Sequence, residues 1–304
     1  MAPQAHRSGK GHLAAARAAT VAALAVLCGC GPSSGRPTAP GPFGNLEPVT
    51  LRGYSGDAME PFITRDGRYL LFNNRNDPSV DTQLQLAERV DDVTFDYRGE
   101  LLGANSAALD GVPSLDSSGT LYFVSTRSYA QDLTTVYRGQ FAAGTVSGVG
   151  EVPGVSRNEA GWVNFDAEIS ADGRTLWLVD GHFSAGAALE SADLLFATQQ
   201  DSGFVRSADS GRILATVNTP ALEYAPAIRA DGLELFFTRV ESITTGTPAL
   251  WRTSRPTPQD AFGMPERVTA ASGFVEGPTL SPDGRSLYFH RLENGTFRIC
   301  RVTR

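Results

Sequence analysis

The sequence predicts an all-β fold, a five-bladed β-propeller of four-stranded blades in which an N-terminal strand completes blade five. Three observations predict it. One phrase recurs five times, at intervals of about 52 to 59 residues. Each copy places a two-residue turn signal between two apolar runs. Two short segments far apart in the chain match closely. A repeat of this length, with strands on both sides of a turn, is typical of propellers.

The repeated phrase aligns without gaps through its central turn. Its copies read EPFITRDGRYLLF, VPSLDSSGTLYF, DAEISADGRTLWL, APAIRADGLELFF and GPTLSPDGRSLYF, beginning at Glu60, Val112, Asp166, Ala225 and Gly277. Asp-Gly between apolar runs predicts a tight hairpin, because Gly accepts positive φ and Asp can bond the nearby backbone. Proline is tolerated near the start of a strand, where no ladder donor is needed. The apolar run after each turn predicts a strand that is buried on both faces between neighbouring blades.

Further strands complete each blade. The third strands are expected at residues 83–89, 135–140, 193–198, 249–254 and 296–302. A fourth, outer strand follows in the first four blades, whereas the chain ends after the third strand of blade five. Residues 43–50 read FGNLEPVT, and residues 262–269, at the outer strand of blade four, read FGMPERVT. We therefore expect residues 43–50 to supply the outer strand of blade five and close the ring, with chance similarity as the alternative.

The phrase resembles the WD40-like repeat of TolB-type propellers, which is close to S-P-D-G-x-x-L-Y-F. Residues 281–289, SPDGRSLYF, match it best, and the resemblance covers residues 43–304. TolB itself has six blades and an added N-terminal domain, whereas this chain has five repeats and no room for that domain. The resemblance therefore implies membership of the broad family and not TolB itself.

The first residues have the pattern of a targeting segment. A basic start, with no acidic residue before Glu47, is followed by an alanine-rich apolar stretch at 18–28. The sequence LCGC that ends at Cys30 resembles a bacterial lipobox, in which the last cysteine receives the lipid. The resemblance implies a lipoprotein signal peptide at 1–29 and lipid attachment at Cys30. An ordinary secretory signal with incidental cysteines is the alternative.

Residues 30–42 would then be the lipid anchor and a flexible tether rich in Gly, Pro and Ser, and residues 43–304 the propeller. The expected location is the bacterial cell envelope, exported and membrane-anchored, on the periplasmic side or the cell surface. A net charge of −7 disfavours nucleic acid and anionic lipid surfaces as direct partners, so the membrane is reached through the lipid alone. By resemblance to TolB, the partner is an envelope protein or a peptidoglycan-associated component, and we expect a monomer.

Little in the sequence points to chemistry. His182 and His290 lie in different repeats and have no ligand spacing with a cysteine, which disfavours a zinc site. The chain contains no Gly-x-Ser-x-Gly elbow and no phosphate-binding loop. Cys300 is the only cysteine after residue 30, so no disulfide within the propeller is possible and a buried thiol is expected. No catalytic group, metal or cofactor is assigned at this level.

One pattern does suggest a site. Each repeat carries an acid just before its first strand and a base just after its second, and in an up-and-down blade these positions share one face. The acids are Glu60, Asp110, Asp166, Glu223 and Glu276, and the bases are Arg75, Arg127, His182, Arg239 and Arg291. We call these ten the mouth residues. They either pair with one another and hold the loops, or form a polar site for a peptide, glycan or cation, aided by the long loops at 73–81 and 180–190.

Two functions remain open. We expect a non-catalytic, lipid-anchored binding or scaffolding propeller. The alternative is a glycoside hydrolase or lyase that uses channel carboxylates, with Glu60, Asp166 and Glu223 as candidates, because glycosidases need two carboxyl groups and one raised pKa. Geometry separates the two. An enzyme should have a carboxylate pair free of arginine partners in the channel, whereas a scaffold should have these acids paired.

Overall fold

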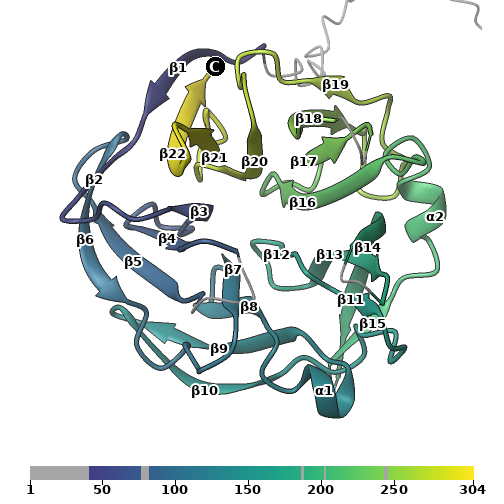
Figure 1. Ribbon diagram of the computed structural model, residues 1–304. Coiled ribbons are helices and arrows are strands. Elements are labelled where there is room, and N and C mark those ends of the chain that lie inside the picture. Colours follow the sequence, from purple (N-terminus) through teal and green to yellow (C-terminus); the bar gives the residue numbers. More distant parts are fainter. Residues whose placement is uncertain (1–40, 77–81, 186–187, 202, 243–245) are drawn as a thin grey trace, which may run out of the picture. The chain divides into compact units, whose positions relative to one another are not determined.

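The computed structural model describes residues 41–76, 82–185, 188–201, 203–242 and 246–304. The predicted signal peptide at 1–29, Cys30 and all of the tether except residues 41 and 42 lie outside the described residues. None of the helices in the described part of the chain has the length and apolar character that a membrane crossing requires. Nearly all the elements of the described chain are strands, and the sheets are arranged radially around a common centre (Figure 1). The prediction of an all-β propeller is confirmed.

Within each repeat, neighbouring strands of the sheet pair antiparallel. Repeat one holds β3 (Met59–Ile63), β4 (Tyr69–Asn73), β5 (Leu84–Arg89) and β6 (Thr94–Glu100). Repeat two holds β7 (Asp110–Leu115), β8 (Thr120–Ser125), β9 (Val136–Ala142) and β10 (Thr145–Glu151). The short helix α1 (Tyr129–Asp132) lies between β8 and β9.

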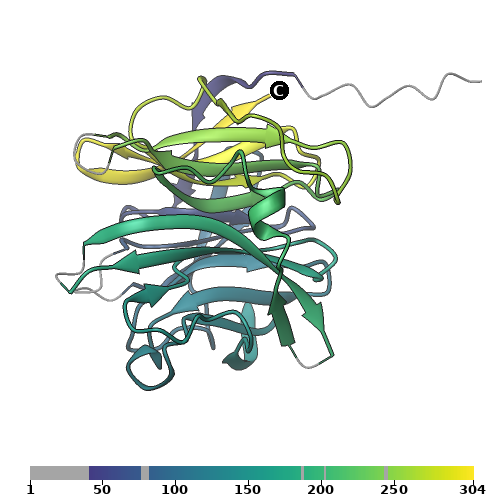
Figure 2. The same ribbon diagram turned by 90° about the vertical axis from the view of Figure 1, so that its right-hand side faces the viewer.

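Repeat three departs from the regular pattern because its innermost strand is interrupted. Both β11 (Trp162–Val163) and β12 (Ala167–Ile169) pair with the long β13 (Thr175–Phe183), and β14 (Leu189–Gln200) and β15 (Gly203–Arg206) follow. The helix α2 (Ser210–Ile213) then contacts β14 on the outside of the sheets, as Figures 1 and 2 show.

The last two repeats lie next to the start of the described chain. Repeat four holds β16 (Leu222–Ile228), β17 (Glu234–Val240), β18 (Ala249–Ser254) and β19 (Glu266–Arg267). Repeat five holds β20 (Val275–Leu280), β21 (Ser286–Glu293) and β22 (Thr296–Thr303). The N-terminal strand β1 (Gly44–Pro48) pairs antiparallel with β22, and Glu47 lies opposite Arg301.

The N-terminal segment also does something that the sequence did not predict. Directly after β1, β2 (Thr50–Arg52) pairs in parallel with β6 of repeat one. The segment therefore hydrogen-bonds to the sheets of repeats five and one in turn. A three-residue edge pairing has too few side chains to show an alternating pattern, so the sequence carries no signal for it.

The core is divided among the faces between repeats. Five buried clusters each draw on two consecutive repeats, and the fifth joins repeat five to repeat one. Fully buried aromatic side chains from the second strands, among them Phe72, Phe123 and Phe289, have no exposed surface. Burial on both faces explains why these strands read as continuous apolar runs.

Candidate functional site

A backbone irregularity recurs at the inner end of the repeats. Glu60, Val112, Ala225 and Gly277 all have φ between 49° and 62°, and each precedes a proline. The pairing of the first and second strands shifts register at these points, as it does at a β-bulge. Positive φ is uncommon for residues other than Gly, and bulges turn side chains away from their regular direction. We call this set, with Asp166 at the equivalent place in repeat three, the bulge positions.

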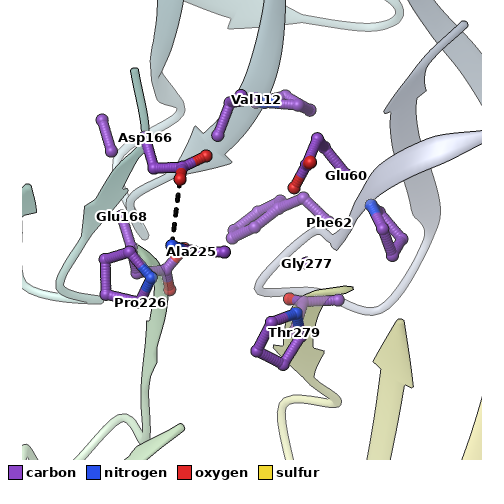
Figure 3. Close-up of a pocket in the computed structure, with 13 residues that line it drawn as sticks. Glu60, Phe62, Val112, Asp166, Glu168, Ala225, Pro226, Gly277 and Thr279 are labelled. Atoms are coloured by element: carbon purple, nitrogen blue, oxygen red, sulfur yellow. Dashed lines mark hydrogen bonds between the residues drawn. The ribbon is translucent and has the colours of Figure 1, made fainter. Parts of the chain in front are cut away.

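The bulge positions of all five repeats line one central cavity. Its volume is about 20 Å³, and its other lining residues include Phe62 and Glu168. Only two of the five bulge positions carry a titratable side chain. Figure 3 shows Glu60 and Asp166 on opposite sides of the cavity, with their carboxyl groups directed into the space between them. The fold therefore brings together two acids that lie more than a hundred residues apart in the chain.

Asp166 is almost completely removed from water, with 3% of its surface exposed. Its Oδ2 accepts a hydrogen bond of 3.0 Å from the backbone N–H of Ala225, which is the contact drawn in Figure 3. Among the described residues, no arginine contacts it. Burial raises the pKa of Asp166 to about 8, the bond from Ala225 opposes this rise, and the charge of Glu276 adds to it.

Glu60 lies near Asn76 and His290, and His290 Nδ1 is 4.0 Å from Glu60 Oε1. The Asn76 amide donates to Glu60 Oε1 over 3.0 Å, and the backbone N–H of Glu60 donates to His290 Nδ1 over 3.1 Å. Burial raises the pKa of Glu60 to about 8. The nearby His290 and Asn76 oppose this rise, whereas Asp166 and Glu276 strengthen it. A carboxyl group in such surroundings is protonated at neutral pH and can donate a proton.

A third acid lies beside the pair. Glu276 accepts a short hydrogen bond from the Tyr224 hydroxyl, and its Oε2 lies 3.2 Å from His290 Nε2. Because His290 Nδ1 accepts the Glu60 N–H, the proton of the neutral imidazole is assigned to Nε2, which donates to Glu276. His290 is fully buried. Its two ring nitrogens link the backbone of Glu60 to the Glu276 carboxylate.

An ion pair lies at the opposite end of the first strands. Arg65 lies 2.9 Å from Glu168 and also donates to the carbonyls of Leu115 and Ile169, so it bridges three repeats. Burial raises the pKa of Glu168, and Arg65 opposes the rise. Although Glu168 lines the cavity, its charge is matched by the Arg65 guanidinium.

Two of the mouth acids have the structural role considered from the sequence. Asp110 pairs with Arg127, and Glu223 pairs with Arg239 over 2.7 Å. Each carboxylate also accepts the backbone N–H four residues earlier and so holds the preceding loop. Both acids are fully buried, and neither lines the cavity. Glu223 is thus wrong as a candidate channel carboxylate.

The remaining mouth bases pair outside the predicted set. Arg75 lies 3.1 Å from Asp57, Arg291 lies 3.5 Å from Glu293, and His182 lies 3.1 Å from Glu190. His182 also packs against Trp162, with 4.8 Å between the ring centroids. The Arg157 guanidinium lies 3.8 Å from the centre of the same indole. Trp162 therefore packs against two polar side chains.

The sequence did contain a signal that separates the two kinds of acid. Glu60 and Asp166 occupy the first position of the repeated phrase, whereas Asp110 and Glu223 lie two residues before that position in their repeats. A shift of two residues moves a side chain from the bulge, which lines the cavity, to the arginine-paired position. Sequence reasoning also missed Tyr224, Asn76 and Glu168, which no repeated pattern marks.

Metal chemistry has no preformed place here. Among residues 41–304, leaving aside those not described, no group of three His, Cys, Asp or Glu side chains is arranged to hold a metal ion. Cys300 is buried in β22, and burial raises the pKa of its thiol to about 11, so the thiol is not activated.

Comparison with known proteins gives the fold and no family. No protein-family model matches the chain, and no curated protein matches it. Among solved structures, a protein described as a glycoside hydrolase aligns with a TM-score of 0.59 at 11% identity, over 86% of this chain and 91% of that one.

Two further structures have similar scores. A putative exo-beta-1,3-galactanase from Bifidobacterium bifidum s17 aligns with a TM-score of 0.55 at 11% identity, over 86% and 92% of the two chains. An endo-arabinase from Bacteroides thetaiotaomicron VPI-5482 aligns with a TM-score of 0.53 at 14% identity, over 85% and 97%. A putative TolB from Agrobacterium tumefaciens aligns with a TM-score of only 0.46 at 14% identity, over 85% and 84% of the two chains.

Proposed function

We propose that the protein is a glycoside hydrolase or lyase that works through Glu60 and Asp166. One observation carries the proposal: the two carboxyl groups face each other across a central cavity, and neither has an arginine partner in the described part of the chain. Catalytic acids need perturbed pKa values, and a pair of acids kept from salt bridges inside a cleft is a candidate for that role. The expectation of a purely structural mouth accounts for Asp110 and Glu223 but not for this pair.

The pair can supply both an acid and a base. Two facing carboxyl groups do not ionise together readily, so over a range of pH they share one proton. Asp166 accepts a backbone N–H, which favours its charged form, and we assign it the role of base. Glu60 accepts a hydrogen bond from the neutral amide of Asn76, and we assign it as the proton donor to the leaving oxygen.

The size of the cavity suits a reacting water. About 20 Å³ exceeds the 10–15 Å³ that one water needs, and it is far too small for a sugar ring. In our proposal the sugar lies at the outer opening of the cavity, and the water that attacks it sits between the carboxyl groups. The glycoside hydrolases with a similar fold support this class of function, and their low identity leaves the substrate open.

A screen against sugars tests the proposal. The purified protein is incubated with a panel of polysaccharides and chromogenic glycosides between pH 5 and 9, and released reducing ends and unsaturated products are measured. Glu60→Gln and Asp166→Asn should each lower the rate at least 100-fold, because each removes a reacting group. Glu159→Gln, which changes an exposed acid that has no ion-pair partner, is the matched control. Turnover that survives both cavity substitutions, or its absence across the whole panel, would contradict the proposal.

Five blades closed by the N-terminal strand remain part of the proposal. In this arrangement β1 is the outer strand of blade five, supported by its pairing with β22 and by the contact of Glu47 with Arg301 at 2.8 Å. Phe43 packs edge-on against Phe236 of repeat four, so the strand ties two repeats together.

The cellular setting is proposed from the sequence. Lipid attachment at Cys30 would hold the propeller at the bacterial envelope, exported, with residues 31–42 as a tether. Two or more acyl chains give lasting attachment to a membrane. In that setting the partner is an envelope component such as a glycan or a protein, reached without direct contact with nucleic acid.

A further inference from the structure

A set of hydrogen bonds between repeats shows why Asp166 is held where it is. In three repeats, the residue after the apolar run of the second strand bonds the backbone N–H at the bulge position of the next repeat. Asn73 accepts from Val112 over 3.0 Å, Thr238 accepts from Gly277 over 3.3 Å, and His290 accepts from Glu60 over 3.1 Å. A polar side chain at this strand position therefore satisfies a buried N–H of its neighbour.

Repeats two and three break this rule. The equivalent residues are Val124 and Val179, which have no polar atom and are buried. Repeat three is followed by Ala225, whose N–H would lack a side-chain acceptor. The Asp166 carboxylate takes that N–H instead, over 3.0 Å. Asp166 is the only bulge residue of the described chain whose side chain makes this kind of bond.

We propose that Val179 is a positioning residue for Asp166: by offering no acceptor, it leaves the Ala225 N–H to the carboxylate and so directs the other carboxylate oxygen into the cavity. The inference rests on the proposed function only for its catalytic meaning, since the bond itself belongs to the structure. A threonine at 179 would accept the N–H, as Thr238 does for Gly277, and would release Asp166.

The groups that face Asp166 fix the direction of the expected change. Glu60 on β3, Glu276 on β20 and Tyr224 on β16 are the titratable neighbours. His290 on β21 contacts Glu60 and Glu276; burial lowers the pKa of His290, but the two acids raise it above its usual value. The Ala225 N–H is therefore the contact that favours the charged carboxylate. If Val179→Thr removes it, the pKa of Asp166 should rise by about one unit, the order expected for one hydrogen bond to a charged group.

The Ala225 amide is itself the probe. In protein labelled with ¹⁵N-alanine, the Ala225 amide shift should titrate with Asp166 in the natural protein, and Asp166→Asn should abolish that titration. In Val179→Thr the titration should disappear or shrink at least threefold. Val179→Ala, which provides no acceptor, should retain it. Val124→Thr should also retain it, because its hydroxyl would face the backbone N–H of Asp166 and not that of Ala225. Val179→Ser provides the hydroxyl with less bulk if threonine prevents folding.

The outcomes are separable from those of the sugar screen. An Ala225 titration that is unchanged in both Val179→Thr and Val179→Ser would overturn the positioning role. Equal loss in Val124→Thr would also overturn it, because the effect would then be general to buried hydroxyls. If the protein is active, Val179→Thr should shift the apparent pKa of the base in the pH–rate profile and leave KM unchanged. A protein that is inactive on every sugar but shows the expected titrations would sink the hydrolase proposal and leave the hydrogen-bond exchange standing.

Discussion

Replacing Asp166 by Asn should make the protein more stable at alkaline pH and remove much of the dependence of its stability on pH. The amide is nearly the same size as the carboxyl, and its oxygen can still accept the Ala225 N–H. What it lacks is the ability to ionise. Asp166 is buried without a cation, so its charged form is disfavoured in the folded state and not in the unfolded chain.

The magnitude follows from linkage. The pKa of Asp166 is about 8 in the folded protein and about 3.9 in an unfolded chain. Below pH 3.9 both states are protonated and the residue has no effect. As pH rises from there towards 8, only the unfolded state loses its proton, so the free energy of unfolding falls by about 1.4 kcal/mol per pH unit and levels off above pH 8. The full loss is on the order of 5 kcal/mol, a large part of the roughly 5–15 kcal/mol of a typical protein.

Urea unfolding followed by tryptophan fluorescence at pH 5, 6, 7, 8 and 9 measures this effect. Asp166→Asn should unfold at clearly higher urea than the natural protein at pH 8, and the difference should shrink at pH 5. Asp201→Asn, at an exposed turn, is the matched control and should follow the natural protein. Parallel pH profiles for the natural protein and Asp166→Asn would refute the reasoning, because Asp166 would then be ionised in the folded state.

Two further predictions concern the N-terminal part of the chain. Removing residues 43–50 should cost several kcal/mol or cause aggregation, since it exposes the edge of β22 and the apolar surface under Phe43 and Leu46, at about 25 cal/mol per Å². A thermal melt should detect this loss, and removal of 31–42 as the control should leave the midpoint unchanged. An unchanged midpoint and a monomeric state without 43–50 would exclude closure by this strand. Cys30→Ala should abolish palmitate labelling and release the protein from membranes, whereas Cys28→Ala should do neither. Labelling that persists in Cys30→Ala would contradict the lipobox assignment.

Most of the fold could be predicted from local sequence patterns. The Asp-Gly turn depends on neighbouring residues, and the apolar run after it reflects burial on both faces, so both can be read without tertiary information. Residues 43–50 were predicted to be an outer strand because they match residues 262–269, and residues 44–48 do pair with β22. The parallel pairing of β2 with β6 left no such trace, since it is brief and lies at an edge.

The site was only half predictable. Repetition placed an acid near the inner end of every repeat, and all five acids lie near that end of the propeller. Which of them face the cavity depended on register: Glu60 and Asp166 occupy the bulge, while Asp110 and Glu223 pair with arginines. A difference of two residues decided this, and it mattered only because the backbone turns at the bulge.

The sequence by itself determined the repeated β-hairpins, the all-β propeller class, the buried Cys300 and the pool of charged residues from which a site could be built. The tertiary structure alone decided that Glu60 and Asp166 meet across one cavity, that Arg65 matches Glu168, and that Asp166 takes an N–H left free by Val179. The physical reason is range. Turns and strands are set by residues close in the chain, whereas the charge state and direction of a buried carboxyl group are set by atoms that only folding brings near.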